Sequence, residues 1–170
     1  MMEERLKVLK VMNEATSRMN LNEFARRVGL NPNQTVEHMQ ELVKVGLLRK
    51  VDGGYGITEK GRFALRAFAP VPNDMEFHFY TGIGQPTGLS SKTIKDFYEL
   101  VKQVDVASLE FHLYRGDFEN WIRTACNDAA FADELASMKK AQLKGENLRK
   151  EIIKATGARY GFEKLLQCVS

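Results

Sequence analysis

Cysteine and histidine are scarce in this chain. Of its 170 residues only two are cysteine and three are histidine. Cys126 and Cys168 lie far apart and form no CxxC pair, so neither a disulfide framework nor a cysteine zinc site is expected. His38, His78 and His112 are also widely separated. The sequence therefore predicts no metal site and no cofactor.

Long apolar runs are missing as well. No run approaches the roughly 20 residues that cross a bilayer. The N-terminus, MMEERLKVLK, carries acidic residues early where a secretory leader would have an apolar stretch. The contents of 44% hydrophobic and 28% charged residues are ordinary for a globular protein. We expect a cytoplasmic protein.

Charge of one sign is not abundant, but the small positive excess is unevenly placed. The net charge is +3. Residues 1–70 hold 12 Lys and Arg against 8 Asp and Glu, which gives +4, and residues 71–170 hold 13 against 14, which gives −1. The positive part is the N-terminal one, which is compatible with a nucleic-acid partner.

The first forty-five residues predict three helices. Apolar residues at helical spacing predict the first over Glu3–Ser17. In NLNEFARRVGL, Asn20 or Asn22 can cap a second helix and Gly29 can end it. A third helix is expected over Asn33–Val45, after an Asn-Pro pair that suits a helix start.

A β-hairpin is predicted next, in GLLRKVDGGYGITEKGRFAL. Strands are expected at Leu47–Val51 and Tyr55–Ile57, on either side of an Asp-Gly-Gly turn. Thr58 then caps another helix. Two short helices joined by a Gly-containing turn and followed by a hairpin form a helix-turn-helix with a wing.

These residues resemble the winged helix-turn-helix domains of prokaryotic transcriptional regulators. The similarity covers roughly Glu3–Phe68 and depends on FARRVGLNPNQTVEHMQELVKVGLLRK followed by GGYGITEKGRFAL. The resemblance implies double-stranded DNA as the partner and Asn33–Val45 as the recognition helix. It places Gln34, Thr35 and His38 near base edges. It also implies a set of basic residues at phosphates: Arg26, Arg27, Lys44, Arg49, Lys50, Lys60 and Arg62.

The third helix departs from the usual pattern of a DNA reader. Glu37 and Glu41 lie on its expected outer side, and it contains no arginine. A carboxylate is repelled by phosphates, although it can accept a hydrogen bond from cytosine. A winged helix that docks on another protein is therefore the alternative to DNA binding.

A boundary is expected in APVPND, residues 69–74, because two prolines interrupt any periodic pattern there. The predicted domains are residues 1–69, a winged helix, and residues 75–170, a mostly helical domain for dimerisation or sensing. The fold class expected for the chain is mainly α, with a small β wing.

Two similar octapeptides occur in the second part: MEFHFYTG at Met75–Gly82 and LEFHLYRG at Leu109–Gly116. The first alternates like a strand, and a Gly-rich loop, TGIGQPTGLSS, is expected after it. Ser90 or Ser91 is expected to cap a helix over Lys92–Val104. The second octapeptide fits a strand or a helix, and its helical flanks favour the helix.

The segment FHLYRGDFENWI, with DAAFADELASM, resembles an uncharacterised, mostly archaeal domain over about Met75–Met138. That domain has no established activity. The resemblance singles out His112, Arg115, Asp117 and Trp121. One interpretation of these residues is structural, with Asp117 as a helix cap. The other makes His78, His112 and Arg115 the polar lining of a pocket for an anionic small ligand.

A narrow apolar stripe occurs near the C-terminus, at Ala141, Gly145, Leu148, Ile152 and Ala155. Its spacing is that of a short coiled-coil seam. The helix that carries it either packs on its own domain or forms a homodimer contact, and we expect a homodimer.

The function that follows from these patterns is DNA binding in transcriptional regulation, and not enzymatic activity. No Ser/His/Asp or Cys/His set stands at an indicative spacing. The protein-docking adaptor is the first alternative. An enzyme that acts through a pocket around His112 is the second.

Overall fold

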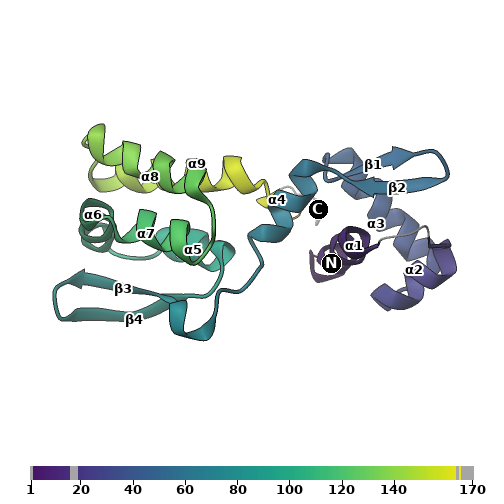
Figure 1. Cartoon of the computed structure of the whole chain (residues 1–170), viewed down its shortest axis with the longest axis horizontal. Coiled ribbons are helices and arrows are strands. Elements are labelled where there is room, and N and C mark those ends of the chain that lie inside the picture. Colours follow the sequence, from purple (N-terminus) through teal and green to yellow (C-terminus); the bar gives the residue numbers. More distant parts are fainter. Residues whose placement is uncertain (1, 16–18, 164, 166–170) are drawn as a thin grey trace. The chain divides into compact units, whose positions relative to one another are not determined.

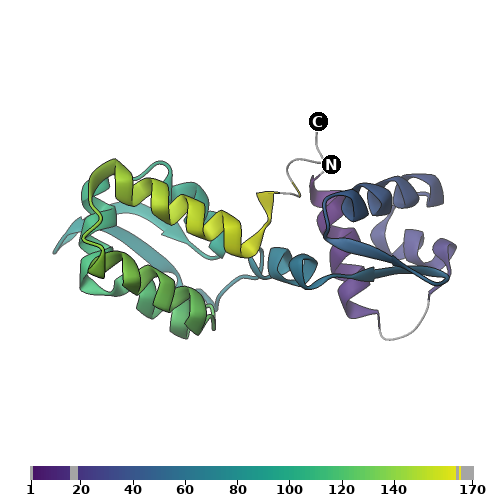
Figure 2. The ribbon, with the colours of Figure 1, turned by 90° about the horizontal axis from the view of Figure 1, so that it is seen from above.

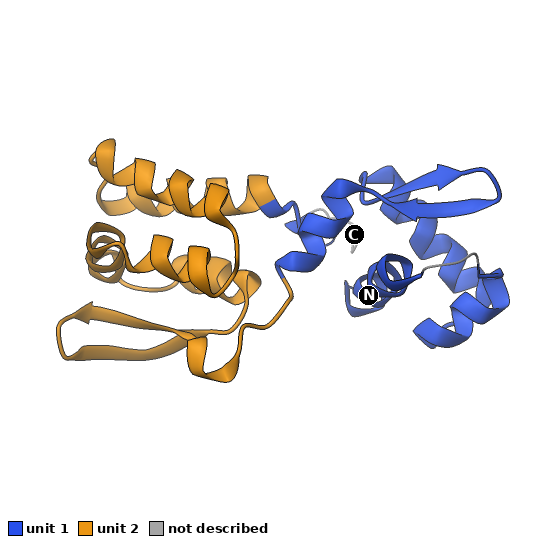
Figure 3. Ribbon diagram, in the orientation of Figure 1, with its two compact units in different colours: residues 1–67, 160–170 blue, residues 68–159 orange. Residues whose placement is uncertain are grey.

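The computed structural model describes residues 2–15, 19–163 and 165. The chain forms two compact units (Figure 3). Unit 1 comprises residues 1–67 and 160–170, and unit 2 comprises residues 68–159. The mainly α fold class, with an N-terminal winged helix and a mostly helical second part, is confirmed. Ser17 and Cys168 of the sequence analysis lie outside the described residues.

Unit 1 begins with three helices, α1 (Met2–Glu14), α2 (Leu21–Val28) and α3 (Pro32–Lys44). The Asn20 side chain caps α2 by accepting from the Glu23 N–H at 2.9 Å. Gly29 ends α2 with φ +76°, a left-handed conformation that glycine adopts without strain. Since both signals are local, the sequence was enough to predict them.

The wing follows as two antiparallel strands, β1 (Leu48–Val51) and β2 (Gly54–Ile57), with Leu48 opposite Ile57 and Val51 opposite Gly54. Its turn lies at the end remote from α4 (Glu59–Arg66) (Figure 1). Thr58 caps α4 by accepting from the Gly61 N–H at 3.0 Å. A Cβ at Gly61 would collide with the Leu47 carbonyl oxygen, so this position requires glycine. The predicted wing and cap are confirmed.

The last described residues, 160–163 and 165, belong to unit 1. Tyr160, Phe162 and Leu165 are fully buried, and the Tyr160 ring lies 6.3 Å from that of Phe63 on α4. The sequence analysis had placed all of residues 75–170 in the second domain. The burial of three large apolar side chains explains the difference, because it removes their surface from water.

Unit 2 has three layers. Helices α5 (Ile94–Val101), α6 (Val106–Arg115) and α7 (Asp117–Thr124) lie between a β3–β4 hairpin and the helices α8 (Ala129–Lys140) and α9 (Gly145–Tyr160) (Figures 1 and 2). The middle layer is aromatic at its centre, where the Phe97 and Phe118 rings are 5.2 Å apart. A short 3₁₀ turn, η1 (Asn73–Met75), leads into the hairpin.

The hairpin consists of β3 (Phe77–Gly82) and β4 (Gln85–Ser91). A strand at β3 was predicted, but the loop prediction for TGIGQPTGLSS is wrong. Pro86 and Gly88 are poor strand formers, and β4 nevertheless pairs with β3 through two register irregularities. At one of them the Thr87 hydroxyl donates to the Phe79 carbonyl at 2.9 Å. Pairing with β3, and not the strand propensity of its own residues, makes this segment a strand.

The caps in unit 2 differ in part from the prediction. Thr93, and neither Ser90 nor Ser91, caps α5, because both serines belong to β4. The second octapeptide is helical, as favoured. It ends α6 at Gly116, which has φ +80°. The same residue is the N-cap of α7. The predicted cap at Asp117 is wrong, since this residue is the first of α7 and its carboxylate binds a side chain of α6.

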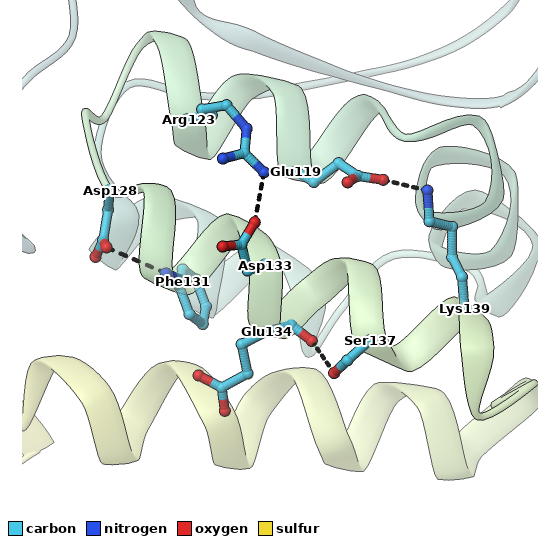
Figure 4. Close-up of polar contacts among 8 residues, drawn as sticks. All are labelled: Glu119, Arg123, Asp128, Phe131, Asp133, Glu134, Ser137 and Lys139. Carbon is cyan, nitrogen blue, oxygen red and sulfur yellow. Dashed lines mark hydrogen bonds and ion pairs between the residues drawn. The ribbon is translucent and has the colours of Figure 1, made fainter.

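Polar contacts join α7, α8 and α9. Figure 4 shows Arg123 donating to Asp133 at 2.8 Å and Lys139 paired with Glu119. It also shows Asp128 accepting from the Phe131 N–H, which caps α8. Both Asp128 oxygens also accept from Arg159 of α9 at 2.7 Å. This buried ion pair fixes the start of α8 to α9.

The C-terminal stripe is part of the protein's own core. Leu148, Ile152 and Ala155 are buried, and Arg149 beside them donates to the Val101 carbonyl at 2.7 Å. Ala141 lies beyond the end of α8 and is exposed. Three of the five stripe residues are therefore unavailable for a homodimer contact, and the homodimer stays a prediction.

Candidate nucleic-acid interface

The outer face of α3 is a row of polar side chains. Asn33, Glu37, Gln40 and Lys44 are all exposed. Their spacing of four, three and four residues places them on one side of the helix. Asn33 and Gln40 were not among the predicted base-contacting residues, although their spacing from Glu37 could have indicated them. Amides, a carboxylate and an ammonium group are the side chains that read base edges.

Thr35 and His38 do not belong to this face, which corrects the prediction that they reach base edges. Thr35 is fully buried, and its hydroxyl donates to the Asn31 carbonyl at 2.9 Å. The His38 side chain is 10% exposed, and its Nε2 lies 3.1 Å from Oε2 of Glu4 on α1. Both residues fall on the side of α3 that also carries Met39 and Leu42, so they contribute to the packing of unit 1.

Gln34 is exposed, but its side chain has a structural partner. Its Oε1 accepts from the Asn31 N–H at 3.3 Å, while the Asn31 side chain accepts from the Gln34 N–H at 2.8 Å. The pair forms a capping box at the start of α3. Contact between Gln34 and a base would require this weaker, longer bond to open.

The predicted phosphate-contacting residues are all exposed, and they lie on four elements. Arg26 and Arg27 end α2, and Arg27 is 3.6 Å from Glu14. Lys44 ends α3, 3.7 Å from Glu41. Such exposed pairs are weak, so both cations remain available to a phosphate.

The other four cations lie on two different elements. Arg49 and Lys50 are adjacent on β1 and therefore point to opposite faces of the wing. Lys60 and Arg62 belong to α4. Arg49 and Arg62 line one hollow of unit 1. The cationic surface thus consists of separate patches around α3 and the wing.

The three predicted ligand-contacting residues, His78, His112 and Arg115, line one pocket of unit 2. They come from β3 and from the end of α6, and their roles differ. His78 is exposed on β3, Arg115 has a side chain 53% exposed, and His112 is 3% exposed.

His112 connects the two octapeptides by hydrogen bonds. Its Nε2 accepts from the Tyr80 N–H at 2.8 Å, and its Nδ1 donates to Asp117 Oδ2 at 2.9 Å. A ring nitrogen that accepts a backbone N–H carries no proton, so the imidazole is neutral. Burial lowers the pKa of His112, and the Asp117 carboxylate opposes that shift only in part. The fixed neutral ring is suited to a structural role, not to general-base catalysis.

The described part of the chain has neither a metal-binding cluster nor a membrane-spanning helix. Within it, no group of three or more His, Cys, Asp and Glu residues could hold a metal ion. None of its helices is both long and apolar enough to span a bilayer. Cys126 is partly buried.

Comparison with known proteins finds a matching family for the N-terminal segment. Residues 6–52 match the family described as the IclR helix-turn-helix domain, and this range covers α1, α2, α3 and β1. No curated protein and no solved structure gives a significant match to the chain. The resemblance of the second part to an archaeal domain stays a prediction. Residues 6–52 are therefore an IclR-type helix-turn-helix, which is a winged helix DNA-binding domain.

Proposed function

We propose that this protein binds double-stranded DNA through α3 and regulates transcription. The observation that carries the proposal is the exposed polar row of Asn33, Glu37, Gln40 and Lys44 on the helix that follows the turn of a helix-turn-helix. In this arrangement the second helix lies in the major groove and presents its outer residues to base edges. A domain of this type favours a regulator over an enzyme.

The flanking cations supply the sequence-independent part of the affinity. Arg26 and Arg27 at one end of the helix-turn-helix, and Lys50 on the wing, are placed on the elements that border α3. Each phosphate contact releases a counterion, so affinity falls as salt concentration rises. The wing cation is expected to contact the backbone or the minor groove.

The direct test is the anisotropy of labelled genomic duplexes titrated with the full chain at about 50 and 200 mM salt. We expect binding that weakens at least tenfold over this range, which several phosphate contacts would produce. Lys50→Glu combined with Arg62→Glu should weaken binding to all sequences alike and reduce the salt slope by about one for each phosphate interaction that the substitutions remove.

A matched control is available in unit 2. Lys140 and Lys150 are exposed on α8 and α9, and reversing both changes the net charge by the same amount. This control should bind DNA nearly as tightly as the wild type. Unchanged binding by Lys50→Glu/Arg62→Glu, or equal weakening by the control, would contradict the proposed surface.

Glu37 favours a second function, docking on a protein partner. Its carboxylate is exposed at the middle of the row, where a phosphate would repel it. In a DNA reader, Glu37→Gln should raise the affinity for random duplexes and reduce any preference for cytosine at one position. An adaptor would show no salt-dependent DNA signal in either form.

A further inference from the structure

A pocket of about 520 Å³ opens in unit 2 between β3 on one side and α6 and α7 on the other. All of its lining residues belong to unit 2. Its volume is within the range of pockets that enclose small molecules. It is separate from α3 and the wing, so the proposal made here is independent of DNA binding.

The most buried lining residues are aromatic rings, and they form the floor of the pocket. Phe77, His112 and Trp121 are each less than a tenth exposed. The Phe77 ring lies 4.8 Å from His112 and 5.7 Å from Trp121, both edge to face. The polar atoms of these rings are already paired, because His112 binds Tyr80 and Asp117, and Trp121 Nε1 donates to the Met75 carbonyl at 2.7 Å. This floor therefore suits an apolar ligand body.

Arg115 supplies a cation at the side of the pocket. Its guanidinium lies 4.7 Å over the Phe111 ring, and its Nε is 3.6 Å from Asp117 Oδ2. Among the described residues, its terminal nitrogens have no hydrogen-bond partner. The aromatic face on one side and the carboxylate near Nε hold the group in place while both terminal NH₂ groups remain free for an anion.

The acidic residues of the lining are already paired. Glu76 lies 3.5 Å from Lys92, and Asp117 binds His112. His78 and Asn120, both exposed, add hydrogen-bonding groups beside Arg115. The lining groups that can still form hydrogen bonds are therefore mainly donors. A ligand with acceptor oxygens would match them.

Ile83 is an exposed apolar side chain at the mouth of the same pocket. It is 86% exposed, at the β3–β4 turn, between Gly82 and Gly84. An aliphatic side chain gains free energy when its surface leaves water. A ligand with an apolar body in the pocket would supply that cover.

We infer that this pocket binds a small amphipathic carboxylate, with Arg115 paired to the carboxylate and Phe77, Trp121 and Ile83 around its aryl or branched alkyl body. Bidentate pairing with a planar carboxylate is the strongest contact that a guanidinium makes. This ligand class accounts for an aromatic floor, a single available cation and an exposed isoleucine in one place.

Trp121 is the single tryptophan of the chain, so its fluorescence reports on this pocket. The full chain is titrated with phenylacetate and, separately, with phenylacetamide, which has the same body without the charge. We expect a saturable fluorescence change with phenylacetate and binding about tenfold weaker with the amide, because charge-assisted hydrogen bonds are lost. Inorganic phosphate, an anion without an apolar body, should not saturate the signal.

Arg115→Gln should remove the preference for phenylacetate over phenylacetamide. Arg123→Gln is the matched control, because Arg123 is exposed on α7 and is not part of the lining. Ile83→Asp serves as a second variant that the fold should tolerate, since its side chain is in solvent. A carboxylate there should weaken phenylacetate several-fold more than the amide.

Three results would overturn the inference: no saturable response to phenylacetate, equal affinity for phenylacetate and its amide, or an unchanged preference in both Arg115→Gln and Ile83→Asp. Saturation by phosphate with the same affinity would show that Arg115 attracts any anion and that the aromatic floor is not used. Circular dichroism of each variant establishes that it is folded.

Discussion

The two similar octapeptides of this protein have different secondary structures. Met75–Gly82 contributes β3, and Leu109–Gly116 forms the end of α6 with its glycine stop. In the strand, alternate residues are buried, so Phe77 and Phe79 are inside and His78 is in solvent. In the helix, the buried residues follow a helical period and include His112. Equivalent histidines therefore have opposite environments.

The flanking residues account for the difference. Asp105 caps α6 by accepting from the Ala107 N–H at 2.8 Å, and Gly116 ends it in a left-handed conformation. The first octapeptide has no such cap and is followed by the turn at Gly84, φ +70°, which returns the chain as β4. The two segments then pack on each other through His112 and Tyr80. Thus the same local pattern takes its structure from its neighbours.

Among substitutions at equivalent positions of the two octapeptides, those of the phenylalanines are expected to differ most in their effect on the free energy of unfolding. Phe77 is 6% exposed and contacts the rings of Phe79, His112, Phe118 and Trp121, whereas Phe111 is only partly buried. Phe77→Ala should lower the free energy of unfolding of unit 2 by about 3–5 kcal/mol. Phe111→Ala should cost about 1 kcal/mol. Urea unfolding followed by Trp121 fluorescence measures both, and equal losses would contradict the assigned burial.

The histidines provide the second comparison. His112→Leu keeps most of the volume but leaves the Tyr80 N–H and the Asp117 carboxylate without their partner. We expect a loss of about 2 kcal/mol in the same unfolding experiment. His78→Leu, at an exposed strand position, should change stability by less than about 0.5 kcal/mol. A similar cost for the two variants would mean that His112 does not join the segments.

The glycines that end the two octapeptides, Gly82 and Gly116, provide the third comparison. Gly116 has φ +80°, and an alanine there is strained, so Gly116→Ala should cost about 1 kcal/mol. Gly82 is not in the left-handed region, and its added Cβ would meet only the end of the flexible Gln85 side chain, at 3.0 Å. Gly82→Ala should therefore be nearly neutral. Thermal unfolding of the pair, monitored at Trp121, tests the difference.

The smallest effect is the pH dependence that His112 contributes to stability. Burial puts its pKa in the folded protein below the ordinary 6.5, so the unfolded chain binds more protons in the range just below pH 6.5. Its contribution to stability is complete above pH 6.5 and is lost as the pH falls through that range. A variant without the imidazole isolates this contribution.

His112→Gln supplies that comparison, because the amide can accept from Tyr80 and donate to Asp117 without titrating. The stability difference between wild type and His112→Gln should therefore narrow, or reverse, as the pH is lowered from 7.5 to 5. Urea midpoints at several pH values give this difference. If it does not change with pH, the imidazole takes up its proton as easily in the folded state as in the unfolded one.

The winged helix was predictable in detail because its signals are short-range. The Asn20 and Asn31 caps, the stop at Gly29 and the Asp-Gly turn each act over a few residues, and all lie where the sequence placed them. The outer face of α3 was predictable only in part. Helical spacing gives a face, but Thr35 and His38 turned inward because α1 supplies Glu4 and a packing surface.

The pocket of unit 2 was less accessible to sequence reasoning. His78, His112 and Arg115 could be named as candidates, but their convergence depends on α6 packing against β3. The strand character of residues 85–91 depends in the same way on a partner strand. Propensity argued against it at Pro86 and Gly88.

The sequence by itself determined where the short helices and the wing turn of the N-terminal winged helix lie, and which residue types are present to bind an anion or a base. The tertiary structure alone decided which of two equivalent histidines is buried, that the C-terminal stripe is core, and that Tyr160 and Phe162 pack in unit 1. The physical reason is the distance along the chain over which each kind of interaction acts. Caps and turns are hydrogen bonds between near neighbours in the chain, whereas burial depends on which distant surfaces meet.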